Sequence, residues 1–245
     1  MNEISIRAEQ LFTIFGFPVT NAVVMSSLVF IVLLVLAFVL RSRLSELPGK
    51  LQYFYEVLVE EILDFMETVL GTRELAERYF PLVATIFFFI LTSNWLGLLP
   101  GVGSIGLKIS SGMTVPLLRS PASDLNFTVV LAVIAVFSVN FLSIVALGFK
   151  KYVGRFVFPK DPISSFAGLL ELISQFVKII SFSFRLFGNV FAGEVLLTIV
   201  AFLAPAVLPL PFLFLEVFVG FIQTFIFSML TLVFVAMAVT EHAHE

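Results

Sequence analysis

Long apolar runs, separated by short polar connections, follow one another along this sequence. The runs are continuous and do not alternate with a period of two, which favours membrane-spanning helices over a membrane β-barrel. A helix needs about 20 apolar residues to cross the hydrocarbon core of a bilayer. The pattern therefore predicts an all-α integral membrane protein, a single domain (1–245) with about five crossings. The expected runs are 19–40, 81–99, 125–149, 163–203 and 205–240.

The last two runs are too long for upright spans. As helices they would measure roughly 60 and 54 Å at 1.5 Å per residue, whereas the hydrocarbon core is about 30 Å thick. No polar break of loop length interrupts either run, and Pro205, Pro209 and Pro211 indicate a turn where the fifth run begins. We therefore expect 163–240 to form a long, strongly tilted helical hairpin.

Between the first two spans, residues 51–70 form an amphipathic pattern. Acidic side chains recur at helical spacing on one face, and apolar side chains occupy the other. The acidic residues are Glu56, Glu60, Asp64 and Glu67. We expect an interfacial helix on the inner membrane surface, whose acidic face is either solvated or a docking surface for a partner subunit.

Basic residues concentrate in two connections on the same side of the predicted membrane. These are Arg41, Arg43, Lys50, Arg73 and Arg78 in the first connection, and Lys150, Lys151, Arg155 and Lys160 in the second. The other side holds Arg7, Lys108 and Arg119. By the positive-inside rule, the N-terminus is outside and the C-terminus is cytoplasmic. Residues 1–18 lack the pattern of a cleavable signal peptide.

A polar stripe runs along the fourth apolar segment at spacings of three or four residues. Its members are Glu171, Ser174, Lys178, Ser181, Arg185 and Asn189. These spacings put all six residues on one face of a helix. Because a polar side chain away from water costs free energy unless it is paired, the stripe is expected to line an aqueous path or a polar protein contact. For Arg185 alone, snorkelling or an interhelical hydrogen bond is the alternative.

The fifth apolar segment carries a sparser polar face, with Glu216 and Gln223 seven residues apart. Glu194 and Glu216 lie at similar distances from the proline-rich turn, so we expect them to reach a similar depth. Two nearby carboxylates in a low-dielectric setting can share a proton. The pair is therefore a candidate proton-handling device, or else an exposed pair of acids at the outer rim.

Arg185 suits a different role, because a guanidinium stays charged at any working pH and cannot pass protons along. A fixed cation instead repels protons and keeps a nearby carboxylate ionised. We therefore expect carboxylates in two access routes and Arg185 as the barrier between them. The small residues Gly188, Ala192 and Gly193 would let another helix approach closely.

Composition narrows the possible functions. The chain is 60% hydrophobic and 13% charged, and its net charge of −3 argues against nucleic-acid binding. It has no cysteine, which excludes disulfides and thiolate metal sites. No glycine-rich phosphate loop followed by Lys-Ser/Thr occurs, so we expect no nucleotide site on this chain. No metal or cofactor is predicted.

The segment SFSFRLFGNVFAGE (181–194) closely resembles the signature of the membrane-embedded a subunit of F-type ATP synthases. That signature is an Arg-Leu-Phe-Gly-Asn core followed by two small residues and an acid. The resemblance extends to NWLGLLPG (94–101), SPASDLN (120–126) and FIQTFIFSMLTLVF (221–234), and so covers nearly the whole chain.

The resemblance implies a stator subunit that lies beside a ring of c subunits and couples proton flow to ring rotation and ATP synthesis. Arg185 would match the essential arginine, the catalytic residue that faces the ring carboxylate. The outer half-channel would contain Asn189, Glu194, Glu216, Gln223, Asn94 and Asp124. The inner half-channel would contain Glu171, Ser174, Lys178 and Ser181, and close packing to the ring would use Gly188, Ala192 and Gly193.

The resemblance also implies partners and a location. The acidic face of 56–67 would meet the b subunits of the peripheral stalk, and membrane lipid would surround the chain. The translocated ion is expected to be H⁺, with Na⁺ as the alternative. We expect a bacterial inner membrane, with an organelle as the alternative. The subunit would be part of an enzyme complex without carrying its nucleotide site.

The sequence departs from the family pattern at two places. Many members pair an acid with a histidine at the positions of Glu194 and Glu216, whereas both are Glu here and the two histidines are His242 and His244. Some members have an acid at the place of Gly97. These departures leave the proton chemistry of the outer channel open.

Two other functions compete with this interpretation. A secondary transporter could bind an anionic substrate at Arg185, but it would be expected to show internal repeats, and we find none. A structural membrane anchor would leave the polar stripe unexplained.

Overall fold

The computed structural model describes residues 8–42, 44, 49–99, 101–102, 106–108, 114–157, 162–204 and 207–240. Two short hairpins precede or connect the helices: β1 (Gln10–Ile14) with β2 (Phe17–Thr20), and β3 (Gly106–Lys108) with β4 (Thr114–Pro116). The helices are α1 (Asn21–Ser42), α2 (Lys50–Leu70), α3 (Arg73–Gly97), the 3-10 turn η1 (Pro121–Ser123), α4 (Leu125–Leu147), α5 (Phe149–Val157), α6 (Pro162–Leu203) and α7 (Pro209–Thr240). Of the residues that the sequence analysis named, Arg7, Arg43, Pro205, Lys160, His242 and His244 lie outside the described residues.

Five of these helices are long and apolar enough to cross a membrane: α1, α3, α4, α6 and α7. Together with the dominance of helix, this confirms the predicted fold class, an all-α integral membrane protein. The two small hairpins were not predicted. Each has only three to five residues per strand, which is too short for a clear alternating pattern.

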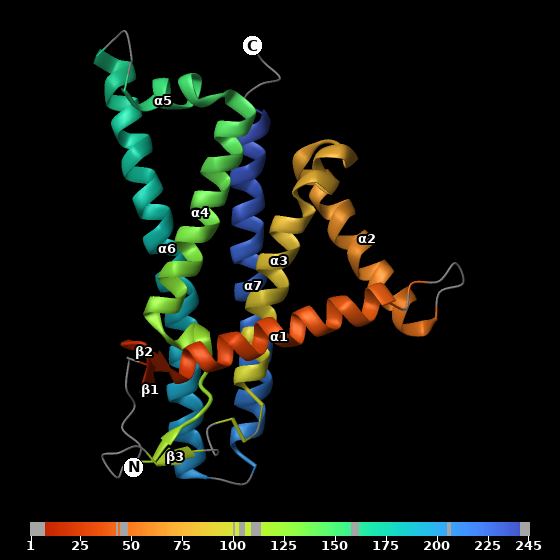
Figure 1. The fold of residues 1–245 in the computed structure, drawn as a ribbon, viewed down its shortest axis with the longest axis vertical. Helices are drawn as coiled ribbons and strands as arrows, with labels where there is room; N and C mark the ends of the chain where they lie inside the picture. Colours follow the sequence, from red (N-terminus) through yellow and green to blue (C-terminus); the bar gives the residue numbers. More distant parts are fainter. Residues whose placement is uncertain are drawn as a thin grey trace.

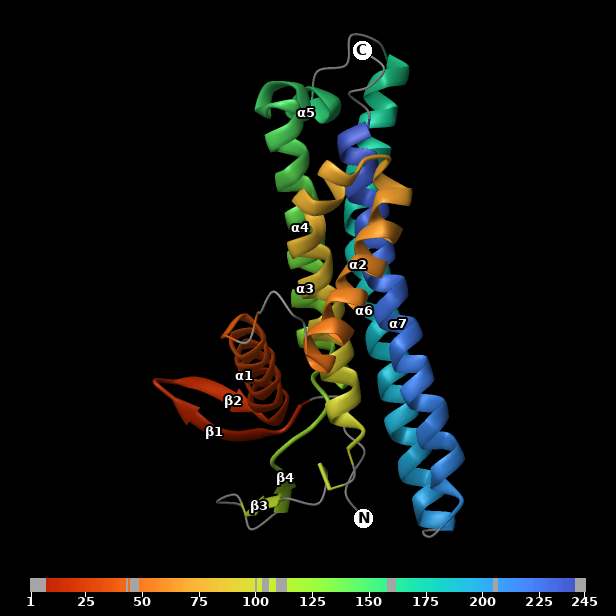
Figure 2. The same cartoon turned by 90° about the vertical axis from the view of Figure 1, so that its right-hand side faces the viewer.

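Four helices, α3, α4, α6 and α7, run along the long axis of the molecule (Figure 1). Helices α6 and α7 form an antiparallel hairpin that spans its whole length. Helix α1 runs across this bundle and is seen almost end-on after the quarter turn of Figure 2. The same membrane normal therefore cannot run parallel to both α1 and the long hairpin.

Helix α6 is one continuous helix of 42 residues, as the absence of a polar break predicted. Helix α3, by contrast, begins eight residues before the predicted limit at Pro81. Its start is fixed by Thr72, whose hydroxyl accepts a hydrogen bond from the Leu75 N–H at 3.4 Å. The helix continues through Pro81, and the Thr85 hydroxyl donates to the Pro81 carbonyl at 2.6 Å, so the proline is not a helix boundary here.

Arg73 holds α2 against the start of α3. Its guanidinium forms ion pairs with four carboxylates, at distances between 2.7 and 3.8 Å. These belong to Glu60, Asp64, Glu67 and Glu77. Three of them are members of the acidic face of α2, so one guanidinium ties this face to α3 and compensates one of the four negative charges. That arrangement favours a structural role for these acids over an unoccupied docking surface.

The bundle interior contains two apolar clusters. One joins α2, α3, α4 and α7 around Met66, Val83 and Leu232. The other joins α3, α4, α6 and α7 around Ile90, Leu186 and Phe227. The second cluster includes Phe182, Leu186 and Val190 of α6 and therefore lies beside the polar positions of that helix.

Candidate functional site: two polar cavities along α6

One face of α6 is packed into the bundle and the opposite face is exposed. Phe182, Leu186 and Val190 are buried, whereas Phe184 and Arg185 are exposed. The predicted polar stripe lies at the border between these faces, since its members other than Arg185 are partly buried. Two cavities adjoin α6 on either side of Arg185 along the helix.

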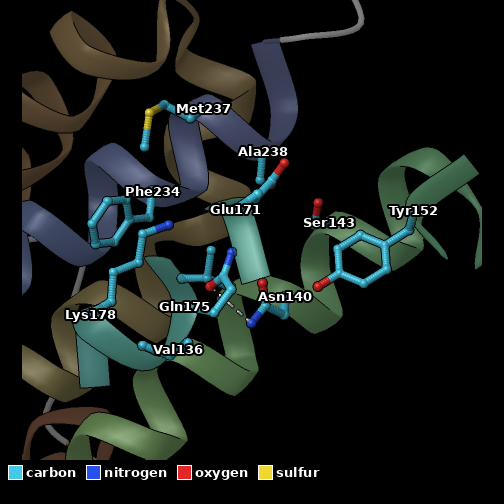
Figure 3. Close-up of a pocket in the computed structure, with 11 residues that line it drawn as sticks. Val136, Asn140, Ser143, Tyr152, Glu171, Gln175, Lys178, Phe234, Met237 and Ala238 are labelled. Atoms are coloured by element: carbon cyan, nitrogen blue, oxygen red, sulfur yellow. Dashed lines mark hydrogen bonds between the residues drawn. The ribbon is translucent and has the colours of Figure 1, made fainter. Parts of the chain in front are cut away.

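The first cavity, which we call the inner cavity, has a volume of about 250 Å³ and lies where α4, α5, α6 and α7 meet. Figure 3 shows Gln175 of α6 facing Asn140 of α4, with Tyr152 of α5 beside Asn140, while Lys178 of α6 points toward Phe234 of α7; Glu171 of α6 also lines the cavity. The Asn140 amide donates to the Gln175 side-chain oxygen at 3.4 Å. The inner cavity therefore combines neutral hydrogen-bonding groups with one acid and one base.

Lys178 and Phe234 both line the inner cavity. The Lys178 ammonium lies 4.2 Å from the centre of the Phe234 ring, a cation–π contact. Phe182 then contacts Phe227 and Phe234, with ring centres 4.8 and 5.9 Å apart. We call Phe182, Phe227 and Phe234 the aromatic cluster; it places apolar rings next to the polar end of the inner cavity.

The second cavity, the outer cavity, has a volume of about 240 Å³. It lies between α3, α6, α7 and the segment that precedes η1. Its polar lining comprises Asn94, Arg119, Ser120, Glu194, Thr198 and Glu216. The structure thus brings Glu194 and Glu216 to one cavity, as their equal distance from the turn predicted, and it adds Asn94 from a third helix.

Arg119 supplies a positive charge to the outer cavity. Its side chain is only 8% exposed, and its Nε lies 3.4 Å from Oε1 of Glu194. The same Nε donates to the Ser123 hydroxyl at 3.0 Å. A buried arginine of this kind requires a carboxylate and hydrogen-bond acceptors to offset its lost hydration. Glu194 supplies the carboxylate, and Ser123 of η1 supplies an acceptor.

Several oxygens of the outer cavity are buried without a hydrogen-bond partner among the described residues. They are Oε2 of Glu194, Oδ1 of Asn94 and Oγ of Ser120. Polar atoms in such positions are ordinarily satisfied by water. Three of them around one cavity indicate a hydrated site.

Glycine allows the close approach of α6 and α7 at the outer cavity. A Cβ on Gly193 would collide with the carboxylate of Glu216, which is 7% exposed. The resemblance assigns Gly193 to close packing against a ring. In the structure Gly193 is instead buried within the chain, and its close neighbour is Glu216.

Asn94 links α3 to α7 beside the same cavity. Its amide donates to the Gly220 carbonyl at 3.2 Å and to the Thr224 hydroxyl at 3.4 Å. Gly97, one turn later, lies against Ser120, and a Cβ there would be 2.6 Å from the Ser120 Cβ. An acid at this place, as in some family members, would not fit this packing.

Arg185 lines neither cavity. Its Nη2 donates to the Ser181 hydroxyl at 3.1 Å, one turn earlier on α6. It forms no ion pair with any described residue. A Cβ added to Gly188 would meet no described atom within 4 Å, and both Gly188 and Ala192 are exposed. Arg185 and these small residues therefore present an unoccupied surface on the outside of α6.

Five further predicted site residues lie outside both cavities, one of them Ser181, the hydrogen-bond partner of Arg185. Asp124 caps α4, and its carboxylate accepts from the Asn126 N–H at 3.0 Å. Ser174 and Asn189 are partly exposed on α6, and Gln223 is partly exposed on α7. The structure thus gives Asp124 a capping function in the loop that carries Arg119.

Sequence reasoning missed several polar lining residues. Arg119 was counted only as a charge that sets orientation, and Gln175 lies one position beyond the polar stripe. Asn140 and Ser143 are three residues apart in a predominantly apolar run. That spacing puts them on one helix face and could have identified them as cavity residues.

No group of three or more His, Cys, Asp or Glu side chains among the residues described here is arranged to hold a metal ion. The charged chemistry of the two cavities is that of carboxylates, one ammonium and one guanidinium. Such groups bind and exchange protons or hold fixed charge.

Comparisons with known proteins agree with the resemblance. A family model described as "ATP synthase A chain" matches residues 23–236. A Campylobacter concisus protein named "ATP synthase subunit a" is 36% identical over 219 residues, which cover 89% of each chain. The Helicobacter pylori (strain Shi470) protein of the same name is 34% identical over 241 residues, which cover 96% of this chain and 99% of the relative.

Proposed function

The chain belongs to the ATP synthase A chain family, and on this premise we propose that it is the proton-channel stator subunit of an F-type ATP synthase. In this role it provides two offset half-channels to the carboxylates of a c-subunit ring. Arg185 separates the half-channels, so that proton flow is coupled to ring rotation and ATP synthesis.

One observation carries the proposal: two polar cavities adjoin α6 on either side of Arg185. At 1.5 Å per residue, Arg185 lies about 21 Å along the helix from Glu171 and about 14 Å from Glu194. Each cavity would give water access to one side of the membrane. A proton would move from one cavity to the other while bound to a ring carboxylate, as the ring rotates past Arg185.

The surroundings of Arg185 support its role as a barrier. It is exposed on the outer face of α6, with Ser181 as its hydrogen-bond partner, and so remains available to a carboxylate of another chain. Because its guanidinium does not release its proton, it can attract an ionised ring carboxylate without relaying protons. Gly188 and Ala192 beside it would let a ring helix approach closely.

The orientation of the helices supports a tilted hairpin. Helix α1 has 22 residues, about 33 Å, which matches the hydrocarbon thickness if α1 stands upright. Since α6 and α7 run across α1 (Figure 1), they would then be strongly tilted and could follow the circumference of a ring. The N-terminus would lie outside and the C-terminus in the cytoplasm, with the peripheral-stalk b subunits near α2.

The alternative transporter function is less well supported. An anion carrier would be expected to place its cation in an enclosed substrate pocket. Arg185 instead lies on an exposed helix face, outside both cavities. We expect H⁺ as the translocated ion, with Na⁺ as the alternative.

Arg185→Ala tests the proposal in the assembled complex. Inverted membrane vesicles that contain the variant should lose ATP-driven proton pumping at least about 100-fold, because the electrostatic contact to the ring carboxylate is removed. Arg185→Lys keeps the charge without the planar fork and should recover little. Arg78→Ala, at an exposed arginine that lines neither polar cavity, is the matched control. Normal pumping by Arg185→Ala would refute the proposed function.

A further inference from the structure

The outer cavity contains a cation that the proposed function does not use. Arg119 is buried in the segment before η1 and forms an ion pair with Glu194 at 3.4 Å. It lines the same cavity as Glu216. A buried arginine that shares a cavity with two carboxyl groups requires an explanation, because burying its charge is costly unless the charge is paired.

The geometry distinguishes the two oxygens of Glu194. Oε1 is held by Arg119, whereas Oε2 is buried and has no hydrogen-bond partner among the described residues. The Ser123 hydroxyl accepts a hydrogen bond from the same Nε at 3.0 Å and so helps to hold the guanidinium in place. Arg119 therefore fixes the carboxylate in an orientation that leaves one oxygen available as a proton acceptor.

Three charged side chains line the outer cavity. α6 contributes Glu194, α7 contributes Glu216, and the loop contributes Arg119; α3 contributes the neutral Asn94. Asp124, nearby in the loop, is engaged in capping α4. Two close carboxyl groups in a low-dielectric setting do not both ionise without compensation. With one fixed positive charge, the cavity is neutral when the pair holds a single proton.

We propose that Arg119 is the positioning residue of the outer half-channel: it orients Glu194 and compensates one carboxylate charge, so that Glu194 and Glu216 share one transferable proton. This inference rests on the proposed function. A proton from the outer water binds to one carboxylate of the pair. The same number of protons then leaves the pair for a ring carboxylate, and the pair returns to its former charge. Arg119 keeps its own proton throughout.

This role also fits the presence of an acid, and not an imidazole, at position 216. An imidazole can be neutral or positively charged, whereas Glu216 adds a negative charge when it loses its proton. Arg119 balances that additional negative charge. It acts through Glu194 and does not itself pass protons.

The test uses the complete ATP synthase in membranes, with passive proton conductance measured after removal of the soluble sector, at a series of outer-side pH values. Arg119→Gln should lower conductance about tenfold, since a positioned proton acceptor is disturbed, and should change its pH profile. Arg119→Lys should restore most of the conductance, because it keeps the charge. In a Glu194→Gln background, Arg119→Gln should have little further effect. Arg78→Gln is the matched arginine control.

A wild-type pH profile in Arg119→Gln would overturn the inference, and so would an equally large effect in the Glu194→Gln background. Incorporation of the chain into the complex is measured first. If Arg119→Gln does not assemble, Ser123→Ala decides the question, because it removes a hydrogen bond that orients Arg119. It should shift the profile in the same direction by a smaller amount, and an unchanged profile would overturn the inference.

Arg185→Ala, measured in the same membranes, separates the two proposals. Normal pumping by Arg185→Ala would refute the stator function itself. Loss of pumping in Arg185→Ala together with a wild-type profile in Arg119→Gln would refute only the role of Arg119.

Discussion

The carboxylate of Glu216 on α7 packs directly against the backbone of Gly193 on α6, next to Glu194. This contact brings two acids from different helices to one cavity. A side chain at position 193 would separate them. The arrangement of the two acids in the outer cavity therefore depends on Gly193, a residue without a side chain.

Gly193→Ala should impair the outer half-channel. The added methyl group must displace the buried Glu216 carboxylate from its position against Gly193, beside Glu194. We expect passive proton conductance to fall by about tenfold or more, comparable to the loss of a positioned acid–base group. Conductance of membranes stripped of the soluble sector is the measurement.

Gly154→Ala in α5 is the matched control, because a Cβ there meets nothing within 4 Å. It should conduct like the wild type. If Gly193→Ala also conducted normally, the contact with Glu216 would not matter for proton access.

The two cavities should be reached by water from opposite sides of the membrane. The chain has no cysteine, so single substitutions can be labelled without background. Asn140→Cys in the inner cavity should react with a membrane-impermeant maleimide added on the cytoplasmic side. Ser120→Cys in the outer cavity should react from the other side.

Ala135→Cys is the control for a dry position, since Ala135 is 1% exposed within the bundle, and it should stay unlabelled from both sides. Labelling of Asn140→Cys and Ser120→Cys from the same side would contradict the assignment of the cavities to two half-channels.

Phe182→Ala should open a proton leak through the subunit. Phe182 belongs to the aromatic cluster beside the inner cavity and is 4% exposed. Removing a buried phenyl ring leaves a cavity and costs about 3–5 kcal/mol of stability. In vesicles with the assembled complex, the imposed pH gradient should decay faster. Phe182→Leu keeps most of the side-chain volume and should leak much less. Equal decay rates for both variants would argue against a role of Phe182 in blocking proton passage.

Arg73→Met should loosen α2 from the start of α3. The side chain is about one-third exposed, so each ion pair is screened and the network of four pairs matters more than any one of them. We expect faster hydrogen exchange in α2, and the difference from the wild type should shrink at high salt. Arg78→Met removes a cation without this network and should leave exchange in α2 unchanged. Exchange in Arg73→Met that equals the wild type at low salt would contradict the role of the network.

The sequence was sufficient to predict the membrane class, the continuous α6 and the helical face that carries Arg185, because these depend on hydrophobicity and helical period. Counting from the turn also placed Glu194 and Glu216 at similar depth. The pattern did not predict Gly193 against Glu216 or Arg119 against Glu194. Those contacts join segments that are far apart in the chain, and their spacing is set by packing between elements.

The limits of α3 illustrate the same point. Pro81 and the apolar run suggested a start at 81, but the Thr72 cap and the ion pairs of Arg73 extend the helix by eight residues. Local polar contacts at the membrane border thus overrode the hydropathy pattern. The acidic face of α2 was recognised from the sequence pattern. The cation that pairs with three of its acids, Arg73, lies just beyond the predicted helix.

The aromatic cluster has a consequence for the assembly of the complex. If the rings of Phe182, Phe227 and Phe234 keep the inner cavity apart from the outer one, the chain by itself contains no continuous proton path. A copy that has been inserted into the membrane but has not yet bound a c-subunit ring would then leave the ion gradient of the cell intact. Proton conduction would begin only when the c-subunit ring binds. The cell could therefore make the subunits in any order without losing its ion gradient.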